Sequence, residues 1–207
     1  MDIKIKKIVV GLLKTNCYII SNNNREATII DPGDEPEKII AYLQSKKITK
    51  VLNILLTHTH PDHIGGLEGL SKKYPSAKIY LSQIEVDFQK NADNKSVYFS
   101  MVFPGVKTNY TPITENEIIP FGEEVFKVIE TPGHTPGSLC YLISECLFSG
   151  DTLFYRSYGI TYFPGGDDQK MKESLIKLSK LPNSTRVYPG HMLETTIGEE
   201  KEFGYLS

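Results

Sequence analysis

The chain of 207 residues is long enough for one sizeable core or at most two small domains, and its 40% hydrophobic and 23% charged residues are ordinary for a globular protein. A net charge of -2 gives no footprint for nucleic acid or acidic lipid, so we expect neither as a partner. No apolar run approaches the roughly 20 residues that span a bilayer, so we expect no membrane insertion. The three cysteines lack metal-ligand spacing and suggest buried side chains in a reducing, cytoplasmic compartment.

The first half of the chain alternates predicted strands and helices. Alternating Ile3 and Ile5 predict a first strand, and the apolar run that follows is too short for a secretory signal. Short apolar runs bounded by turn residues predict further strands at residues 17–21, 27–30, 51–56 and 78–81. Apolar residues at helical spacing predict helices at residues 35–46 and 67–74.

The second half repeats the order of strands followed by a helix. Strands are predicted at residues 117–121, 125–130, 139–143, 146–149 and 186–188, and an amphipathic helix at 169–181. No linker or change of composition divides the chain, so we expect one domain over residues 1–207. Residues 91–112 predict either a disordered segment or a functional flap, and 96–104 either a flap or an interface between subunits, which leaves the oligomeric state open.

Four potential metal ligands fall within the six residues His58-Thr59-His60-Pro61-Asp62-His63, directly after a predicted buried strand. A helical pattern begins at Ile64, so the cluster occupies a strand-to-helix turn, where side chains two residues apart can converge beyond the sheet. Neutral imidazole and carboxylate groups suit a divalent ion such as zinc. The alternative is a polar loop whose histidines only hydrogen-bond, and four candidate ligands this close together disfavour it.

Three further ligand candidates follow other predicted strands. His134, Asp151 and His191 each come directly after a glycine at the C-terminal exit of a strand, where a rigid sheet holds the loop in place. Glycine permits a positive φ and a close backbone approach to an ion. One such position would be ordinary loop chemistry, but the three together use every remaining histidine of the chain. They therefore favour a single metal centre.

These motifs resemble those of the metallo-β-lactamase superfamily, whose signature is HxHxDH followed by a distant His, a distant Asp and a final His. The similarity covers most of the chain, and Gly150-Asp151-Thr152-Leu153-Phe154 and Phe163-Pro164-Gly165-Gly166-Asp167 are most like the glyoxalase II-like hydrolases. The resemblance implies an α/β fold, a four-layer αβ/βα sandwich with metals at the sheet edge. It implies one ion bound by His58, His60 and His134, a second by Asp62, His63 and His191, and Asp151 bridging both.

The implied activity is hydrolysis of a small-molecule thioester, such as a hydroxyacyl-glutathione, by a metal-bound hydroxide. Two divalent cations lower the pKa of bound water to about 7 and hold an oxyanion as a carbonyl is attacked. Asp62 is the predicted catalytic residue, because it can bind metal, orient the hydroxide and accept its proton. Zinc is the expected metal, and iron and manganese suit the same ligands. Asp31 is either a hydrogen-bond acceptor for a ligand histidine or a turn former.

The substrate contacts of the resembling enzymes are only partly present. Glyoxalase II enzymes add a C-terminal helical domain that contacts glutathione, whereas this chain ends shortly after His191. Relatives with a short C-terminus often read Gly-Arg-Thr-Asp where this chain has Gly159-Ile160-Thr161-Tyr162. The candidate substrate-binding residues are Tyr155, Arg156, Tyr158 and Tyr162. The alternative is that these tyrosines cover the edge of the core.

Other activities use the same ligand positions. A persulfide dioxygenase holds one iron with two His and one Asp, and the corresponding residues here are His58, His134 and Asp151. A lactonase is a further alternative. A purely structural metal site is disfavoured, because structural zinc is usually closed by four ligands and prefers Cys, and none of the three cysteines occupies a ligand position. An Asp at position 151, where one common type of zinc β-lactamase has Cys, weighs against antibiotic hydrolysis.

Overall fold

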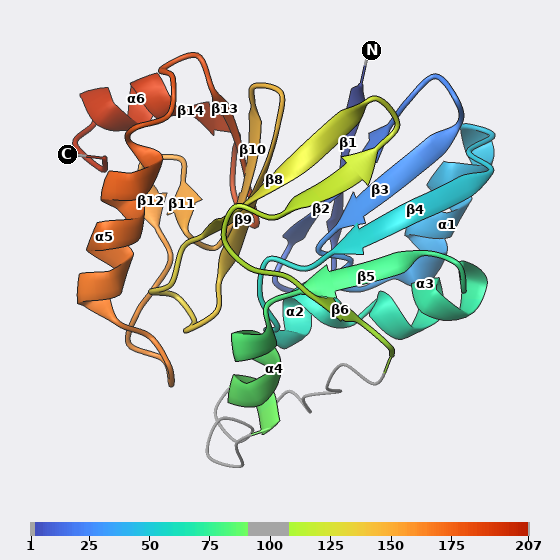
Figure 1. The fold of residues 1–207 in the computed structure, drawn as a ribbon, viewed down its shortest axis with the longest axis horizontal. Coiled ribbons are helices and arrows are strands. Elements are labelled where there is room, and N and C mark those ends of the chain that lie inside the picture. Colours follow the sequence, from blue (N-terminus) through green and yellow to red (C-terminus); the bar gives the residue numbers. More distant parts are fainter. Residues whose placement is uncertain (1–2, 91–107, 207) are drawn as a thin grey trace.

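Two six-stranded sheets form the centre of the structure, a computed structural model that describes residues 3–90 and 108–206 (Figure 1). The first sheet has the order β1-β2-β3-β4-β5-β6. Its strands are β1 Lys4–Val10, β2 Thr15–Ser21, β3 Glu26–Ile30, β4 Lys50–Leu55, β5 Lys78–Leu81 and β6 Thr111–Pro112. The second sheet has the order β14-β13-β10-β9-β8-β7. Its strands are β7 Ile118–Phe121, β8 Glu124–Glu130, β9 Leu139–Ile143, β10 Cys146–Gly150, β13 Arg186–Pro189 and β14 Thr195–Thr196.

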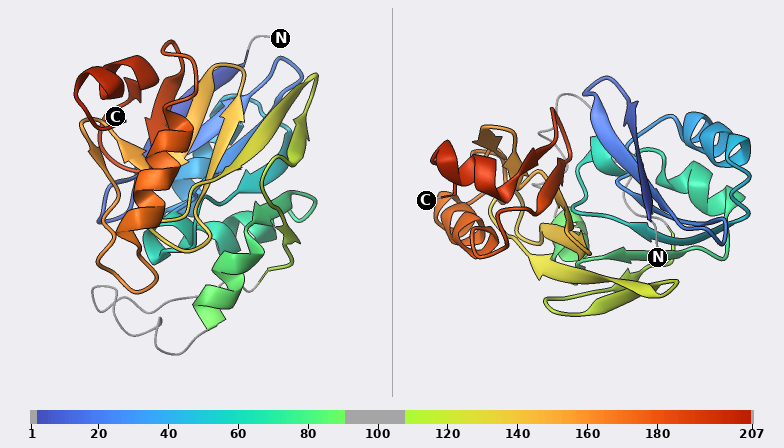
Figure 2. Two further views of the ribbon diagram at one scale, coloured as in Figure 1. Left: turned by 60° about the vertical axis from the view of Figure 1, so that its left-hand side comes forward. Right: turned by 90° about the horizontal axis from the view of Figure 1, so that it is seen from above.

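Helices cover the outer faces of the sheets. The helices of the first half are α1 Pro36–Ser45, α2 Pro61–Ile64, α3 Leu67–Lys73 and α4 Gln83–Lys90, and those of the second half are α5 Asp168–Leu178 and α6 Ile197–Glu202. Seen from above in Figure 2, α1 and α3 lie on one side of the molecule and α5 and α6 on the other, with the sheets between them. The predicted four-layer αβ/βα sandwich is therefore confirmed.

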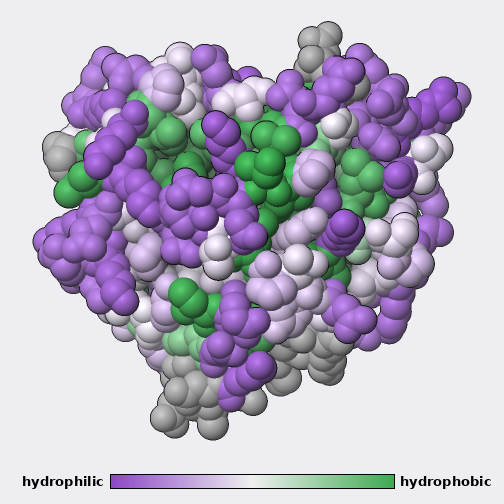
Figure 3. Space-filling model, viewed as in Figure 1, coloured by the Kyte–Doolittle hydropathy of each residue, from purple (hydrophilic) through white to green (hydrophobic). Residues whose placement is uncertain are grey.

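Three apolar clusters hold these layers together. The central cluster joins the two sheets and includes Tyr18 and Leu55 from the first and Phe126 and Tyr141 from the second. A second cluster packs α1 and α3 on the first sheet, and a third packs α5 and α6 on the second. Each strand that faces both a helix layer and the other sheet is buried on both faces, which explains the continuous apolar runs in the sequence. On the face seen in Figure 3, hydrophilic side chains predominate and hydrophobic ones reach the surface in separate patches.

Strand direction determines where the loops emerge. Strands β3, β4 and β5 are parallel, as are β10 and β13. The carboxyl ends of parallel neighbours meet at one edge of their sheet, so residues that follow β3 and β4, or β10 and β13, are brought together. This edge is where the sequence carries its candidate ligands.

The elements that the sequence did not predict are mostly short. They are α2, α4, α6, β6, β14 and the separate hairpin of β11 Leu153–Phe154 and β12 Ser157–Tyr158. Except for the eight-residue α4, these elements have two to six residues, which is too few to show a clear periodicity. Most of the stretch predicted as a loop or flap, including all of 96–104, lies outside the described residues. Among the helices of the described residues, none combines the length and the apolar character needed to cross a bilayer.

Candidate metal centre

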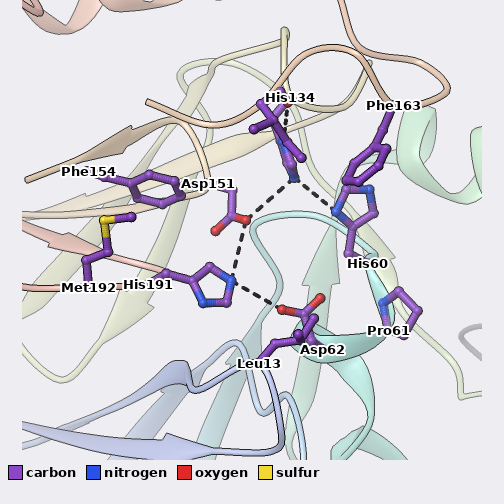
Figure 4. A pocket seen from close by; sticks show the side chains of 11 residues that line it. Leu13, His60, Pro61, Asp62, His134, Asp151, Phe154, Phe163, His191 and Met192 are labelled. Carbon is purple, nitrogen blue, oxygen red and sulfur yellow. Dashed lines mark hydrogen bonds and ion pairs between the residues drawn. The ribbon is translucent and has the colours of Figure 1, made fainter. Parts of the chain in front are cut away.

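All five histidines and the two candidate aspartates meet at the sheet edge described above. His58, His60, Asp62 and His63 follow β4, and His134 follows β8. Asp151 follows β10 and His191 follows β13. In Figure 4 five of these side chains come from both halves of the chain and point into one space: His60, Asp62, His134, Asp151 and His191. The convergence predicted from the sequence is therefore present.

The ligand atoms form three groups, in each of which every atom lies within 4.8 Å of the others. They are His58 with His60 and His134, His58 with His63 and Asp151, and Asp62 with His63 and His191. The first and third match the two ion sites that the family resemblance implies. Carboxylate oxygens of Asp151 lie 3.4 Å from His63 Nε2 and 3.6 Å from the Nε2 atoms of both His134 and His191. Asp151 is thus positioned between the two sites, as a bridging ligand would be.

Hydrogen bonds on the far side of the ring orient three of the histidines, His58, His63 and His134. The Asp31 carboxylate accepts hydrogen bonds from His63 Nδ1 at 3.0 Å and from the Thr57 hydroxyl at 2.7 Å. Because Thr57 donates its one proton to Asp31, its oxygen is left to accept from His58 Nδ1, 3.0 Å away. His134 Nδ1 donates to the Ile160 carbonyl at 2.8 Å. The Nε2 atoms of His58, His63 and His134 are therefore directed at the centre, as metal ligation requires.

Asp31 also forms the turn that the sequence suggested. Its backbone has φ 49°, and its second carboxylate oxygen accepts a hydrogen bond from the backbone N–H of Thr57 at 2.8 Å. The carboxylate is therefore a hydrogen-bond acceptor for a ligand histidine, and the turn itself is closed by main-chain atoms, with the Gly33 N–H donating to the Asp31 carbonyl at 2.8 Å.

The electrostatics of the centre favour cations. Burial, followed by the neighbouring imidazoles, holds the pKa values of His58 and His60 well below their usual range, so both rings are neutral. Burial acts to lower the pKa of His63, but the carboxylates of Asp151, Asp62 and Asp31 outweigh it and raise this pKa to about 10. His58 Nε2 is buried and has no hydrogen-bond partner within the described part of the chain. A buried polar atom of this kind is costly unless an ion satisfies it, so the donor set fits divalent metal.

Two glycines are required by the tight packing around Asp151. Gly150 has φ 49°, and a Cβ at this position would lie 2.4 Å from Thr57 Oγ1. A Cβ on Gly190 would lie 2.3 Å from a carboxylate oxygen of Asp151 and 2.7 Å from His63 Cε1. Glycine at each position therefore lets the backbone approach the ligands closely.

A pocket of about 270 Å³ opens onto the ligands (Figure 4). Five ligand side chains form part of its wall: His60, Asp62, His134, Asp151 and His191. The remaining wall residues are Leu13, Pro61, Phe154, Ile160, Phe163 and Met192. The ligand cluster is therefore accessible to a small molecule from one side.

The predicted substrate residues differ from this wall. None of Tyr155, Arg156, Tyr158 and Tyr162 is among the residues that line the pocket. The Arg156 guanidinium lies 3.7 Å from the ring centroid of Phe203 at the end of α6, and the Arg156 backbone N–H donates to Glu200 of the same helix. The structure therefore does not place these four candidate residues at the pocket wall. The sequence does carry one signal for the apolar wall, because Ile160 stands in the Gly159-Ile160-Thr161-Tyr162 stretch where similar proteins often have arginine.

Glu85 is a residue of the centre that sequence reasoning missed. It lies on α4 and is fully buried. Its carboxylate accepts hydrogen bonds from the backbone N–H and hydroxyl of Thr59, at 3.1 and 2.9 Å, and from the Gly137 N–H at 2.9 Å. It thereby joins the loop that carries His58 and His60 to the loop that carries His134. A single glutamate at the start of a short helix has no pattern that could have indicated this.

Comparisons with known proteins agree with this geometry. A profile of the Metallo-beta-lactamase superfamily matches residues 10–191. An uncharacterised protein of Aquifex aeolicus is 40% identical over 96% of this chain and 94% of its own length. The hydroxyacylglutathione hydrolase GloC of Haemophilus influenzae is 33% identical over 97% of this chain and 95% of its own.

Solved structures show the same similarity. The BLEG-1 B3 metallo-beta-lactamase superposes with a TM-score of 0.91 at 35% identity, covering 99% of this chain and 100% of the other. TTHA1623 in a di-iron-bound form superposes with a TM-score of 0.85 at 34% identity, covering 96% and 98%. With the superfamily profile matching most of its length, the chain belongs to the metallo-beta-lactamase superfamily, as a metal-dependent hydrolase.

Proposed function

We propose that this hydrolase cleaves a thioester, with hydroxyacyl-glutathiones among the candidate substrates, and that two divalent ions occupy the ligand groups described above. The observation that carries the proposal is the position of Asp151 between two complete sets of ligands, beside a pocket open to small molecules. The similarity to GloC supports the thioester, because that relative is named a hydroxyacylglutathione hydrolase and matches nearly end to end.

The reaction transfers an acyl group to water. The oxygen of water bonds to the carbonyl carbon, the C–S bond breaks with its electron pair on sulfur, and a carboxylic acid and a thiol are released. When bound, the divalent ions supply activation of water at neutral pH and stabilisation of negative charge on the carbonyl oxygen. The protein holds the ligands rigidly for this purpose, through the hydrogen bonds of Asp31, Thr57 and the Ile160 carbonyl.

Asp62 is the proposed proton acceptor. One of its carboxylate oxygens accepts a hydrogen bond from the Thr15 hydroxyl at 2.8 Å and lies 3.2 Å from His191 Nε2. Burial acts to raise the pKa of Asp62, but the neighbouring His63 and His191 hold it below its usual range. The side chain is thus an ionised carboxylate at the pocket wall, fixed in orientation and able to take the proton that water releases.

Zinc is the metal we propose, with iron as the alternative that the di-iron form of TTHA1623 supports. Metal analysis of the purified protein tests this directly. Two ions per chain support the proposal, whereas one ion per chain at saturation contradicts the two-site assignment.

The activity is tested by hydrolysis of S-D-lactoylglutathione with the zinc-loaded protein. Asp62→Ala should reduce turnover by at least a hundredfold, because it removes both a metal ligand and the proton acceptor. Asp87→Ala, which removes an exposed carboxylate on α4, is the matched control and should leave turnover unchanged. Turnover of the Asp62 variant close to that of the unmodified protein would refute the role of this residue.

A persulfide dioxygenase is the second candidate, because His58, His134 and Asp151 also lie together at the first site. Oxygen uptake with glutathione persulfide, measured on the iron-loaded protein, distinguishes this activity from hydrolysis. Lactones and β-lactams belong in the same substrate panel, the latter because BLEG-1 is named a metallo-beta-lactamase. Faster turnover of any of these substrates than of every thioester would refute the thioester proposal.

A further inference from the structure

The wall of the pocket at the ligand cluster consists of two kinds of residue, candidate metal ligands and apolar side chains. Every residue of the wall that is not a candidate metal ligand is apolar: Leu13, Pro61, Phe154, Ile160, Phe163 and Met192. These residues come from four separate parts of the chain, namely the turn between β1 and β2, the start of α2, the segment 154–163 and the loop after β13. The apolar character is therefore a property of the assembled pocket and not of one segment.

The described residues of the same wall carry no fixed positive charge. Within residues 3–90 and 108–206, no Lys or Arg lines the pocket. Arg156, the cation nearest in sequence to the wall residue Phe154, is held against the ring of Phe203. Among the described wall residues, the polar groups are thus concentrated at the ligand cluster, where a scissile carbonyl would lie, and the side chains beside it are apolar.

We infer that the acyl group of the substrate is uncharged and apolar, and larger than a lactoyl group. The inference rests on the thioester hydrolysis proposed above and specifies the half of the substrate that enters the pocket. A carboxylate or ammonium group there would lose its hydration without gaining a partner, which is unfavourable, whereas each methylene that enters gains transfer free energy. The pocket volume of about 270 Å³ is near the lower end of the range for small-molecule pockets. We therefore expect the gain in transfer free energy to end once the acyl group reaches medium length.

A series of thioesters tests this with one uncharged thiol, N-acetylcysteamine, held constant. The acyl group is varied from acetyl through butyryl and hexanoyl to octanoyl, beside D-lactoyl and the ω-carboxylate analogue of hexanoyl. We expect kcat/KM to rise about fourfold for each added methylene until the pocket is filled. The carboxylate analogue should be at least tenfold poorer than hexanoyl. Equal rates along the series, or a preference for lactoyl or for the carboxylate analogue, would overturn the inference.

Two variants test whether the dependence of kcat/KM on acyl chain length arises in this pocket. Ile160→Asn changes a wall residue that is 39% exposed, so the fold tolerates the change, and only its backbone carbonyl bonds His134. We expect kcat/KM for the hexanoyl thioester to fall about tenfold, with a change below about twofold for acetyl. Ile118→Asn, at an isoleucine 58% exposed on β7, is the matched control and should leave the series unchanged. A chain-length dependence that persists in the Ile160 variant would overturn the assignment to this wall.

A binding measurement separates this inference from the proposed activity. Calorimetric titration of the zinc-loaded protein with straight-chain carboxylates, from acetate to octanoate, needs no turnover. Affinity that rises with chain length supports the apolar pocket even when no thioester is hydrolysed, in which case the thioesterase proposal alone fails. Thioester hydrolysis with carboxylate affinities independent of chain length would overturn the inference and leave the proposed activity standing.

Discussion

Replacing Glu85 with Gln should weaken both the fold and the metal centre. The buried carboxylate accepts three hydrogen bonds, two from Thr59 and one from Gly137. Thr59 stands between His58 and His60, and Gly137 comes three residues after His134. These three histidines form the first ligand group, so Glu85 is a positioning residue for it.

The size of the effect follows from the hydrogen bonds. An amide has one oxygen, so in either orientation its NH₂ group faces a backbone N–H, of Thr59 or of Gly137, and that donor loses its acceptor. A buried donor without an acceptor costs about 1–3 kcal/mol. Glu85→Ala would leave three donors unsatisfied at about 3–9 kcal/mol, comparable to the whole stability of many domains. Glu85→Gln is therefore the informative variant.

Urea unfolding and zinc titration measure the two consequences separately. We expect Glu85→Gln to lower the free energy of unfolding of the metal-free protein by about 1–3 kcal/mol. A displaced Thr59 backbone also misplaces its neighbouring ligands, so we expect one zinc ion to bind at least about tenfold more weakly, a difference of about 1.4 kcal/mol. The gain in stability on adding zinc should shrink accordingly.

Glu200 provides the matched control for this experiment. It is also fully buried, and its carboxylate accepts hydrogen bonds from the Thr195 hydroxyl and the Arg156 N–H, on the outer side of the second sheet. Glu200→Gln should cost less stability, because the Thr195 hydroxyl can accept from the new amide NH₂ while the amide oxygen still accepts from the Arg156 N–H, and it should leave zinc affinity unchanged. If Glu85→Gln binds zinc as tightly as the unmodified protein, or both variants lose the same affinity, the positioning role is refuted.

Three further predictions concern the ligand cluster. Asp31→Asn removes the carboxylate that orients His63 and should lower metal affinity about 10- to 100-fold by titration; unchanged affinity would contradict the role assigned to its hydrogen bond. Gly190→Ala forces a Cβ toward Asp151 and should abolish most turnover, while the far-UV circular dichroism stays that of the unmodified protein. Full activity would show that the loop can shift to accommodate the Cβ without moving Asp151. Removal of metal by a chelator should lower the melting temperature, reversibly on adding zinc, because ions at 100 times their Kd stabilise the fold by roughly 2.7 kcal/mol; a melting temperature insensitive to chelation would count against ions at this site.

The patterns in the sequence determined the order of the main strands and helices and the identity of the ligand candidates, and the family resemblance supplied the layered architecture. Apolar runs gave the central strands, because strands buried on both faces leave a continuous local signal. The stretch 58–63 and the glycine-preceded His134, Asp151 and His191 could be read because each is a short motif at a strand end. The helix at Asp168–Leu178 was equally readable from its spacing, although it ends at Leu178, three residues before the expected 181.

Only the tertiary structure decided what surrounds those ligands. Glu85 reaches Thr59 and Gly137 across 26 and 52 positions of the chain, so no local pattern marks it. The sequence makes Arg156 a candidate for substrate binding, whereas in the structure its guanidinium stacks on the ring of Phe203. The apolar wall of the pocket is assembled from four separated segments. In each case the decisive contact lies between residues far apart in sequence, and its partners are fixed by the pairing and packing of the sheets, which spacing along one chain does not encode.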